Sequence, residues 1–248
     1  MAFNPNNYKA PEAKKLPVIL LLDVSGSMSG AKIDSLYDST IDMIETFAAA
    51  QAKEQVIDVA IITFGNGVDL HTRYTPVKDL QTKGISKFKA SGMTPMGTAL
   101  RMAKDMIDDK NETPSRIYRP AVVLVSDGAP NDDWKGPMDK FINEGRSAKC
   151  QRFAVAIGND ADRSVLERFT QDPNAVLFAE DAKDISEQFK TISMSISTMA
   201  IAPNSNSVPT PSTVPKYDNN TANDTMMIYI NCEGGMNYGT SNWRSGGN

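Results

Sequence analysis

The chain has 248 residues, of which 40 % are apolar and 23 % charged, the composition of an ordinary soluble globular protein. Its formal net charge of −4, with no local cluster of Lys or Arg, excludes a nucleic-acid-binding surface built on phosphate contacts. No apolar stretch is long enough to span a membrane, and the polar N-terminal segment lacks the apolar core of a signal peptide. We therefore expect a cytoplasmic protein without membrane or nucleic-acid partners.

Cysteine and histidine, which supply many metal and catalytic sites, are scarce. Cys150 and Cys232 are the only cysteines and are far apart in the chain, without a C-x-x-C pair, so we expect neither a zinc site nor a disulfide framework. His71 is the only histidine, and it falls in a predicted strand that carries none of the candidate serines. This position argues against a Ser-His-Asp triad.

The first predicted strand is followed by a loop of oxygen-bearing side chains. After a polar arm at residues 1–15, five apolar residues at 18–22 indicate a central parallel strand that is covered on both faces. In the DVSGSM segment that follows, Asp23, Ser25 and Ser27 occupy every second position. Carboxylate and hydroxyl oxygens suit hard cations such as Mg²⁺, Mn²⁺ or Ca²⁺. We interpret this loop as half of a metal site.

A helix, a hairpin and a further helix are predicted next. Apolar residues recur at helical spacing over residues 33–51, and residues 56–64 have the composition of a buried strand. An Asn-Gly pair before residues 68–73 predicts a hairpin with an antiparallel return strand. A loop then leads to SGMTPMG, where Thr94 before Pro95 resembles a helix N-cap followed by proline at the first helical position.

The second half of the chain repeats this alternation. Residues 121–125 form another uninterrupted apolar run, and Ser126, Asp127 and Gly128 follow it as the first motif follows the first strand. The remaining elements are predicted, in order, as a helix at 136–149, a strand at 153–157, a short helix at 162–171, a strand at 175–178 and a closing helix at 185–199.

Strands that alternate with helices predict a doubly wound α/β domain, with a mainly parallel central sheet, helices on both faces and one antiparallel edge strand. We place this domain at residues 16–201. Residues 202–225, rich in Pro, Ser, Thr and Asn, have the composition of a linker. The tail at residues 226–248 contains one candidate strand, at 226–232.

The two halves of the candidate site should meet at one edge of the sheet. In such sheets ligands bind beyond the carboxyl ends of the strands, where the winding direction reverses. The candidate ligands are Asp23, Ser25, Ser27, Thr94 and Asp127. This all-oxygen set favours Mg²⁺, with Mn²⁺ close behind. Each residue taken alone also fits a helix cap or a turn, but the combination favours a metal site.

Three segments carry a family resemblance. DVSGSM at 23–28, SGMTPMGTAL at 91–100 and VSDGAPND at 125–132 resemble the motifs of a von Willebrand factor type A domain, and the resemblance extends over residues 16–201. It implies a metal-ion-dependent adhesion site. The ligands implied by the resemblance are Asp23, Ser25, Ser27 and Thr94, with Asp127 acting directly or through a water.

The resemblance also implies a function. Such domains bind protein partners in a cation-dependent manner, and an Asp or Glu of the partner completes the coordination of the ion. Among the subfamilies, TPMGTAL together with DGxPxD is most similar to the bacterial TerY-type proteins of tellurium-resistance and stress gene clusters. Those proteins are thought to scaffold partners such as a phosphatase and a kinase. This sequence lacks the cysteine-rich C-terminal zinc module of some relatives.

Two alternatives to an interaction module stay open. The site could serve a metal-dependent hydrolase or phosphatase that uses Asp23, or the ion could be purely structural within a scaffold. Two-metal hydrolysis needs more carboxylates than Asp23 and Asp127. The first motif is also D-x-S, not the D-x-D of aspartate-nucleophile phosphatases. We therefore expect no enzymatic activity.

Residues beside the motifs carry weaker signals. Asp132 and Asp133 fit a solvated loop pair better than a role in supporting the metal ligands. Met28, Met93 and Met96 flank the candidate site and fit simple packing better than an adaptable contact ring for a partner.

Overall fold

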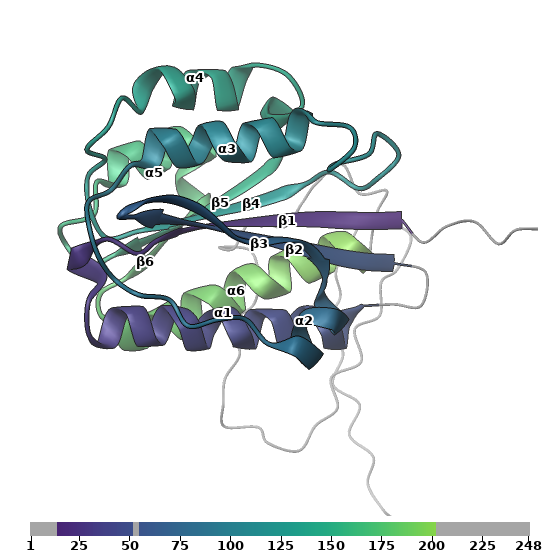
Figure 1. Ribbon diagram of the computed structural model, residues 1–248, viewed down its shortest axis with the longest axis horizontal. Helices are drawn as coiled ribbons and strands as arrows, with labels where there is room; N and C mark the ends of the chain where they lie inside the picture. The colour runs from purple at the N-terminus through teal and green to yellow at the C-terminus, as the bar shows by residue number, and fades with distance from the viewer. Residues whose placement is uncertain (1–13, 52–54, 202–248) are drawn as a thin grey trace, which may run out of the picture. The chain divides into compact units, whose positions relative to one another are not determined.

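Strand β1 (Lys14–Asp23) lies inside the sheet, with eight consecutive buried residues at its carboxyl end. The computed structural model describes residues 14–51 and 55–201, and its six strands follow the order β3-β2-β1-β4-β5-β6 (Figure 1). The other strands are β2 (Gln55–Gly65), β3 (Gly67–Pro76), β4 (Ala121–Ser126), β5 (Gln151–Ile157) and β6 (Val176–Ala179). All neighbours pair in parallel except β2 and β3. The predicted doubly wound α/β class with one antiparallel edge strand is confirmed.

Helices cover both faces of this sheet. They are α1 (Ala31–Ala50), α2 (Val77–Lys83), α3 (Met96–Asp108), α4 (Lys135–Asn143), α5 (Arg163–Thr170) and α6 (Ala182–Ile201). Short 3₁₀ turns occur at η2 (Gly26–Met28), η3 (Ser147–Lys149) and η4 (Pro173–Ala175). One face is covered by α1, α2 and α6, and the other by α3, α4 and α5 (Figure 1).

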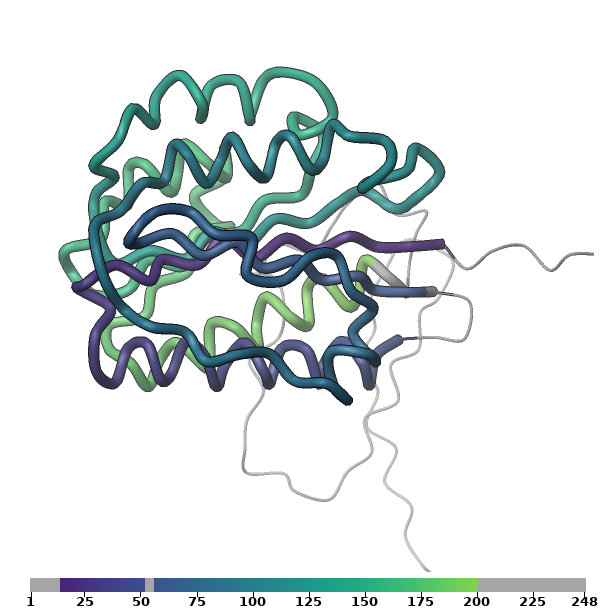
Figure 2. The backbone as a smooth tube through the Cα atoms, viewed as in Figure 1, coloured from purple at the N-terminus to yellow at the C-terminus, as the bar shows by residue number. Residues whose placement is uncertain are grey.

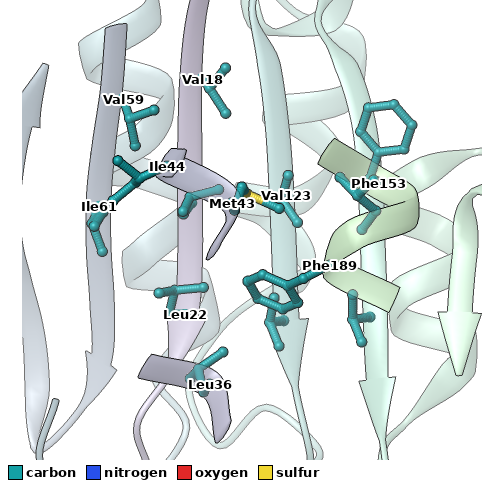
Figure 3. Close-up of a cluster of buried hydrophobic side chains, with 14 of the residues drawn as sticks. Val18, Leu22, Leu36, Met43, Ile44, Val59, Ile61, Val123, Phe153 and Phe189 are labelled. Carbon is teal, nitrogen blue, oxygen red and sulfur yellow. The ribbon is translucent and has the colours of Figure 1, made fainter. Parts of the chain in front are cut away.

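The uninterrupted apolar run of β1 follows from burial on both faces. Val18, Leu20 and Leu22 pack in the cluster beneath α1 and α6, which Figure 3 shows, whereas Ile19 and Leu21 pack in the cluster beneath α3 and α4. Successive side chains of a strand point to opposite faces. A strand between two helical layers therefore needs an apolar residue at every position.

The start of β1 differs from the predicted boundary. The strand begins at Lys14, inside the predicted polar arm, and includes Pro17. Proline lacks a backbone N–H and is rare in central strands. It is tolerated here because β4 pairs with β1 only from Val18 onwards, so that Pro17 has a strand neighbour on one side alone.

Two helical boundaries also differ. Helix α2 occupies a segment that was predicted as loop, and it is short because only Val77 and Leu80 are buried before Gly84 ends it. The helix predicted at 136–149 ends at Asn143, because Gly145 adopts a φ of +67° that a continuing helix does not allow. The chain resumes with the 3₁₀ turn η3.

Several predicted segments lie outside the described residues. They are the first part of the N-terminal arm, the linker at 202–225 and the strand at 226–232, which stay predictions. Within residues 14–51 and 55–201, no helix has the length and apolar composition that crossing a membrane requires.

We expect Phe189→Ala to lower the free energy of unfolding by about 3–5 kcal/mol, the usual cost of truncating a buried phenylalanine. Phe189 of α6 is 1 % exposed and packs in the same cluster as Met43 and Val123 (Figure 3). The control substitution Glu187→Ala lies on the exposed side of α6. It should change the free energy of unfolding by about 0.5 kcal/mol or less. Urea denaturation measures both. Equal effects of the two substitutions would contradict the packing of α6 on this core.

Candidate metal centre

The candidate site lies where the winding direction of the sheet reverses. β1 and β4 are neighbours, with Leu22 paired to Val125, so Asp23 and Ser126 come next at the same edge. The chain adds β2 on one side of β1 and β4 on the other, which creates the crevice where open α/β sheets bind ligands. Figure 2 shows the loops after β1 and β4 at this edge of the sheet.

Asp23 is fully buried, and both of its carboxylate oxygens accept a hydrogen bond. Oδ1 accepts from the backbone N–H of Ser25 at 2.9 Å, and Oδ2 accepts from the hydroxyl of Ser126 at 2.6 Å. Ser126 is the last residue of β4 and was not assigned a role in the site from the sequence. This hydrogen bond joins the end of β4 to the end of β1 and fixes the orientation of the Asp23 carboxylate.

A chain of hydroxyls joins the first motif to Asp127. The hydroxyls of Ser25 and Ser27 are 3.0 Å apart, and the Ser27 hydroxyl donates to Asp127 Oδ1 at 2.7 Å. The other oxygen of Asp127 accepts from Lys32 Nζ, also at 2.7 Å. Lys32 lies in the first turn of α1 and was not predicted as part of the site. Asp127 is therefore buried, at 1 % exposure, with both oxygens bonded.

Thr94 lies in the loop before α3, beside the loop after β4. It does not cap a helix, so the predicted N-cap is wrong. Helix α3 begins at Met96, with Pro95 as the residue before it. Thr94 instead pairs with Asn131, whose Oδ1 accepts from Thr94 N–H at 2.9 Å and whose N–H donates to Thr94 O at 3.1 Å. A β-carbon on Gly128 would lie 3.8 Å from Thr94 Oγ1, so this hydroxyl lies beside the turn after β4.

Backbone hydrogen bonds tie the first motif loop to the loop that carries Thr94. Gly26 N–H donates to Gly92 O at 3.0 Å, and the N–H of Ser91 donates to the carbonyl of Val24 at 2.8 Å. Gly92 has a φ of +79°, and a β-carbon there would lie 2.5 Å from the backbone nitrogen of Asn66. This close approach requires glycine.

Asp132 ties the loop after β4 to α3. Its carboxylate accepts from the backbone N–H of Gly97 at 2.9 Å and of Thr98 at 2.8 Å, and from the Thr98 hydroxyl at 2.9 Å. These bonds satisfy N–H groups that the first turn of a helix leaves free, and they place negative charge at its positive end. The interpretation of Asp132 as part of a solvated loop pair is therefore wrong, whereas Asp133 is exposed.

Burial is the main influence on the charge of Asp23. It raises the pKa of this carboxyl above its usual value, hydrogen bonds from Ser126 and Ser25 lower it, and the charge of Asp127 raises it further. Two buried carboxylates therefore repel each other, and of the two only Asp127 is bonded to a cation of the described chain, Lys32. A divalent cation would compensate the remaining negative charge.

The oxygen chemistry of the site fits a hard cation. Hydrogen bonds join four of the sequence-predicted residues, Asp23, Ser25, Ser27 and Asp127. The Thr94 hydroxyl lies beside Gly128, the residue after Asp127. Residues 14–51 and 55–201 contain no group of three or more His, Cys, Asp or Glu side chains that could hold a metal. An ion at this edge would thus be held by two carboxylates, hydroxyls and water, a combination that suits Mg²⁺.

Other reactive side chains lie elsewhere. Burial raises the pKa of the Cys150 thiol to about 12, which keeps it protonated and inert. The His71 ring lies on β3 with Nε2 2.9 Å from the Ser86 hydroxyl. Its Nδ1 is 3.0 Å from Thr72 Oγ1, a hydroxyl where a catalytic triad has a carboxylate. Among the methionines flanking the motifs, Met93 is 63 % exposed.

Met28 and Met96 are fully buried, as packing residues would be. A ring of three methionines around the site is therefore not formed, and Met93 alone of the three offers an exposed apolar side chain next to Thr94.

We expect Asp132→Ala to lower the free energy of unfolding by about 1–2 kcal/mol, the upper part of the range for loss of a helix cap. The substitution removes three hydrogen bonds at the start of α3. Urea denaturation in EDTA measures the loss without any contribution from bound metal. The matched control is Asp133→Ala, an exposed carboxylate one residue away. If both variants lose the same stability, Asp132 does not cap α3.

We expect Asp23→Asn to stabilise the metal-free domain at pH 7. Because the folded pKa of Asp23 is raised, its favourable contribution is present at low pH and is lost as the pH rises through that folded value. Asparagine keeps an acceptor for the Ser25 N–H without the buried charge. In EDTA, the variant's advantage over wild type should shrink as the pH falls toward 3.8, the ordinary value for aspartate. A variant less stable than wild type at pH 7 in urea denaturation would contradict the buried-charge assignment.

The von Willebrand factor type A domain family matches residues 18–191 of this chain. A comparison with curated protein sequences gives no match. Among solved structures, the chain is similar to proximal thread matrix protein 1 from the mussel byssus with a zinc-occupied MIDAS motif, at 16 % identity and a TM-score of 0.61. The similarity covers 75 % of this chain and 48 % of that one, so the chain spans about half the length of this neighbour.

Two further structures show the same fold. A von Willebrand factor type A protein from Catenulispora acidiphila has 17 % identity and a TM-score of 0.59 over 74 % of this chain and 43 % of that chain. The von Willebrand factor domain of the pili tip protein Mfa5 from Porphyromonas gingivalis has 13 % identity and a TM-score of 0.59 over 79 % of this chain and 99 % of that chain. By its strand order and the family match over most of its length, the chain belongs to the von Willebrand factor type A domain family.

Proposed function

We propose that this domain is a divalent-metal-dependent protein-interaction module in which an Asp or Glu of the partner completes the coordination of the ion. In this proposal Asp23, Ser25, Ser27 and Thr94 hold the metal, and Asp127 acts directly or through a water. The observation that supports the proposal is a pair of buried carboxylates, Asp23 and Asp127, at the reversal point of the sheet. The hydroxyls of Ser25 and Ser27 link the first motif to Asp127, and Lys32 is bonded to Asp127.

Hydrogen bonds within the chain preorganise the proposed metal ligands. Ser126 and the Ser25 N–H hold the two oxygens of Asp23, so that the carboxylate cannot rotate freely. Ser27 links the first motif to Asp127. Preorganised ligands lower the ordering cost of binding. When bound, the ion supplies the positive charge that attracts an acidic side chain of a partner.

Mg²⁺ is the ion that we propose, with Mn²⁺ or Ca²⁺ as alternatives. All five candidate side chains offer oxygen, and none offers nitrogen or sulfur. Hard cations prefer oxygen ligands. The mussel byssus protein holds zinc in its motif. Zinc favours nitrogen and sulfur ligands, so we propose that it is a weaker candidate here.

We propose a binding role in preference to hydrolysis. The candidate site has two carboxylates, fewer than two-metal hydrolysis needs, and His71 bonds to Ser86 and Thr72 on the β3 side of the sheet. A hydrolase or phosphatase that uses Asp23 is the alternative function, and a scaffold with a purely structural ion is a further one. Release of phosphate from a generic ester, lost in Asp23→Ala, would favour the hydrolase.

The biological setting that we propose follows from the motif resemblance. The motif resemblance to TerY-type proteins supports a scaffold role in a bacterial stress or tellurium-resistance system, with a phosphatase or kinase as a candidate partner. A cytoplasmic location belongs to the same proposal. Copurification with the products of neighbouring genes, in Mg²⁺ and in EDTA, tests it.

We expect Mg²⁺ to stabilise the wild-type domain by about 2.7 kcal/mol at a concentration about 100-fold above its dissociation constant. For a domain of this size the melting temperature should rise by about 5–10 °C. Asp23→Ala should abolish this shift, because it removes a buried ligand, whereas Asp133→Ala should retain it. Thermal unfolding with MgCl₂ and with EDTA gives the answer. A full Mg²⁺ shift in Asp23→Ala would rule out the proposed site.

A further inference from the structure

Lys32 bonds to the candidate site from outside the three sequence motifs. Its ammonium group donates to Asp127 Oδ2 at 2.7 Å, and its side chain is 30 % exposed while that of Asp127 is fully buried. On its other side the ammonium lies near the loop after β5, since a β-carbon on Gly158 would be 3.8 Å from Nζ. The Lys32 ammonium group therefore lies between Asp127, which follows β4, and Gly158, which follows β5.

The other ion pairs of residues 14–51 and 55–201 lie away from the metal candidates. They are Lys15–Asp58, Arg73–Glu112, Lys83–Asp79, Lys104–Asp108 and Arg168–Asp139. Within the described chain, Lys32 is thus the cation that forms an ion pair with a candidate metal ligand. Removing it would leave a buried carboxylate without its ionic partner.

Lys32 changes the net charge of the candidate site. Asp23 and Asp127, when ionised, carry two negative charges, and Lys32 brings the site to −1. A divalent cation then brings it to +1, whereas without Lys32 the loaded site would be neutral. The excess positive charge opposes the metal and attracts an anion, because charges in a partly buried site are poorly screened.

We propose that Lys32 couples the metal to an anionic ligand: it weakens the binding of Mg²⁺ alone and strengthens the binding of a carboxylate to the Mg²⁺-loaded site. This inference rests on the proposed metal-dependent function. The coupling is reciprocal, so the carboxylate increases Mg²⁺ affinity by the same factor by which Mg²⁺ increases carboxylate affinity. The domain thereby favours the complex of ion and acidic partner over the ion alone.

The size of the effect follows from Coulomb's law. Two unit charges about 4 Å apart in bulk water interact with an energy equivalent to about fivefold in affinity, and more strongly in a partly buried site. We therefore expect removal of the Lys32 charge to change Mg²⁺ affinity by about tenfold.

The test measures Mg²⁺ affinity by titration calorimetry in sodium chloride and in sodium acetate at equal ionic strength, with acetate as the carboxylate probe. The variants are Lys32→Met, which removes the charge and keeps the chain length, and Lys32→Arg, which keeps the charge. The control is Lys149→Met, which makes the same change of net charge at an exposed residue of η3, just before the amino end of β5. Circular dichroism checks the fold of each variant.

In chloride, Lys32→Met should bind Mg²⁺ about tenfold more tightly than wild type, and Lys32→Arg and Lys149→Met should remain close to wild type. Acetate should increase Mg²⁺ affinity in wild type and much less in Lys32→Met. In EDTA, Lys32→Met should be less stable than wild type, because Asp127 loses its partner. A merely structural role would lower stability and metal affinity together, so opposite changes identify the coupling.

The outcomes separate this inference from the function on which it rests. If wild type binds Mg²⁺ and Lys32→Met binds it equally or more weakly, Lys32 does not couple the ligands and the metal site itself stands. An acetate effect of equal size in both proteins, or none in wild type, overturns the coupling as well. If wild type binds no Mg²⁺, the proposed function fails and the inference fails with it.

Discussion

Two carboxylates buried at the ends of adjacent strands constrain the rest of this edge of the molecule. Asp23 and Asp127 follow β1 and β4, and each is at most 1 % exposed. A buried charge is costly unless it is bonded and compensated. The surrounding residues meet this need: Ser126 and Ser25 donate to one carboxylate, and Ser27 and Lys32 donate to the other. A divalent cation would complete the compensation.

The fold holds the required groups in place from three separate loops. The first motif loop is bonded to the Gly92 loop through backbone groups, and the loop after β4 is bonded to Thr94 through Asn131 and to α3 through Asp132. Because these contacts involve main-chain atoms and short polar side chains, they restrict the relative movement of the loops. The loops that carry the candidate ligands are therefore held together by contacts within the chain itself. Such rigidity is what a site needs when it binds a small cation and leaves access for an outside ligand.

Much of the fold was predictable because its signals are local. Uninterrupted apolar runs marked β1 and β4, and helical periodicity marked α1 and α6. The predicted convergence of Asp23 and Asp127 followed from parallel strands ending at one edge. The contacts that sequence reasoning missed connect distant segments: Asp132 caps a helix 35 residues away from it in sequence, and Lys32 bonds to a carboxylate 95 residues away. Thr94 before Pro95 has the local sequence pattern of a helix N-cap. In the structure Thr94 pairs with Asn131 instead, which local sequence does not reveal.

The central claim is that the oxygen-lined edge between β1 and β4 holds a divalent cation. Crystals grown with saturating Mn²⁺, and collected at a wavelength where manganese scatters anomalously, test this claim most directly. We predict one strong anomalous peak within coordination distance of Asp23 and of the hydroxyls of Ser25, Ser27 and Thr94. A site without anomalous density at saturating Mn²⁺, or a peak bound elsewhere on the domain, would contradict the claim.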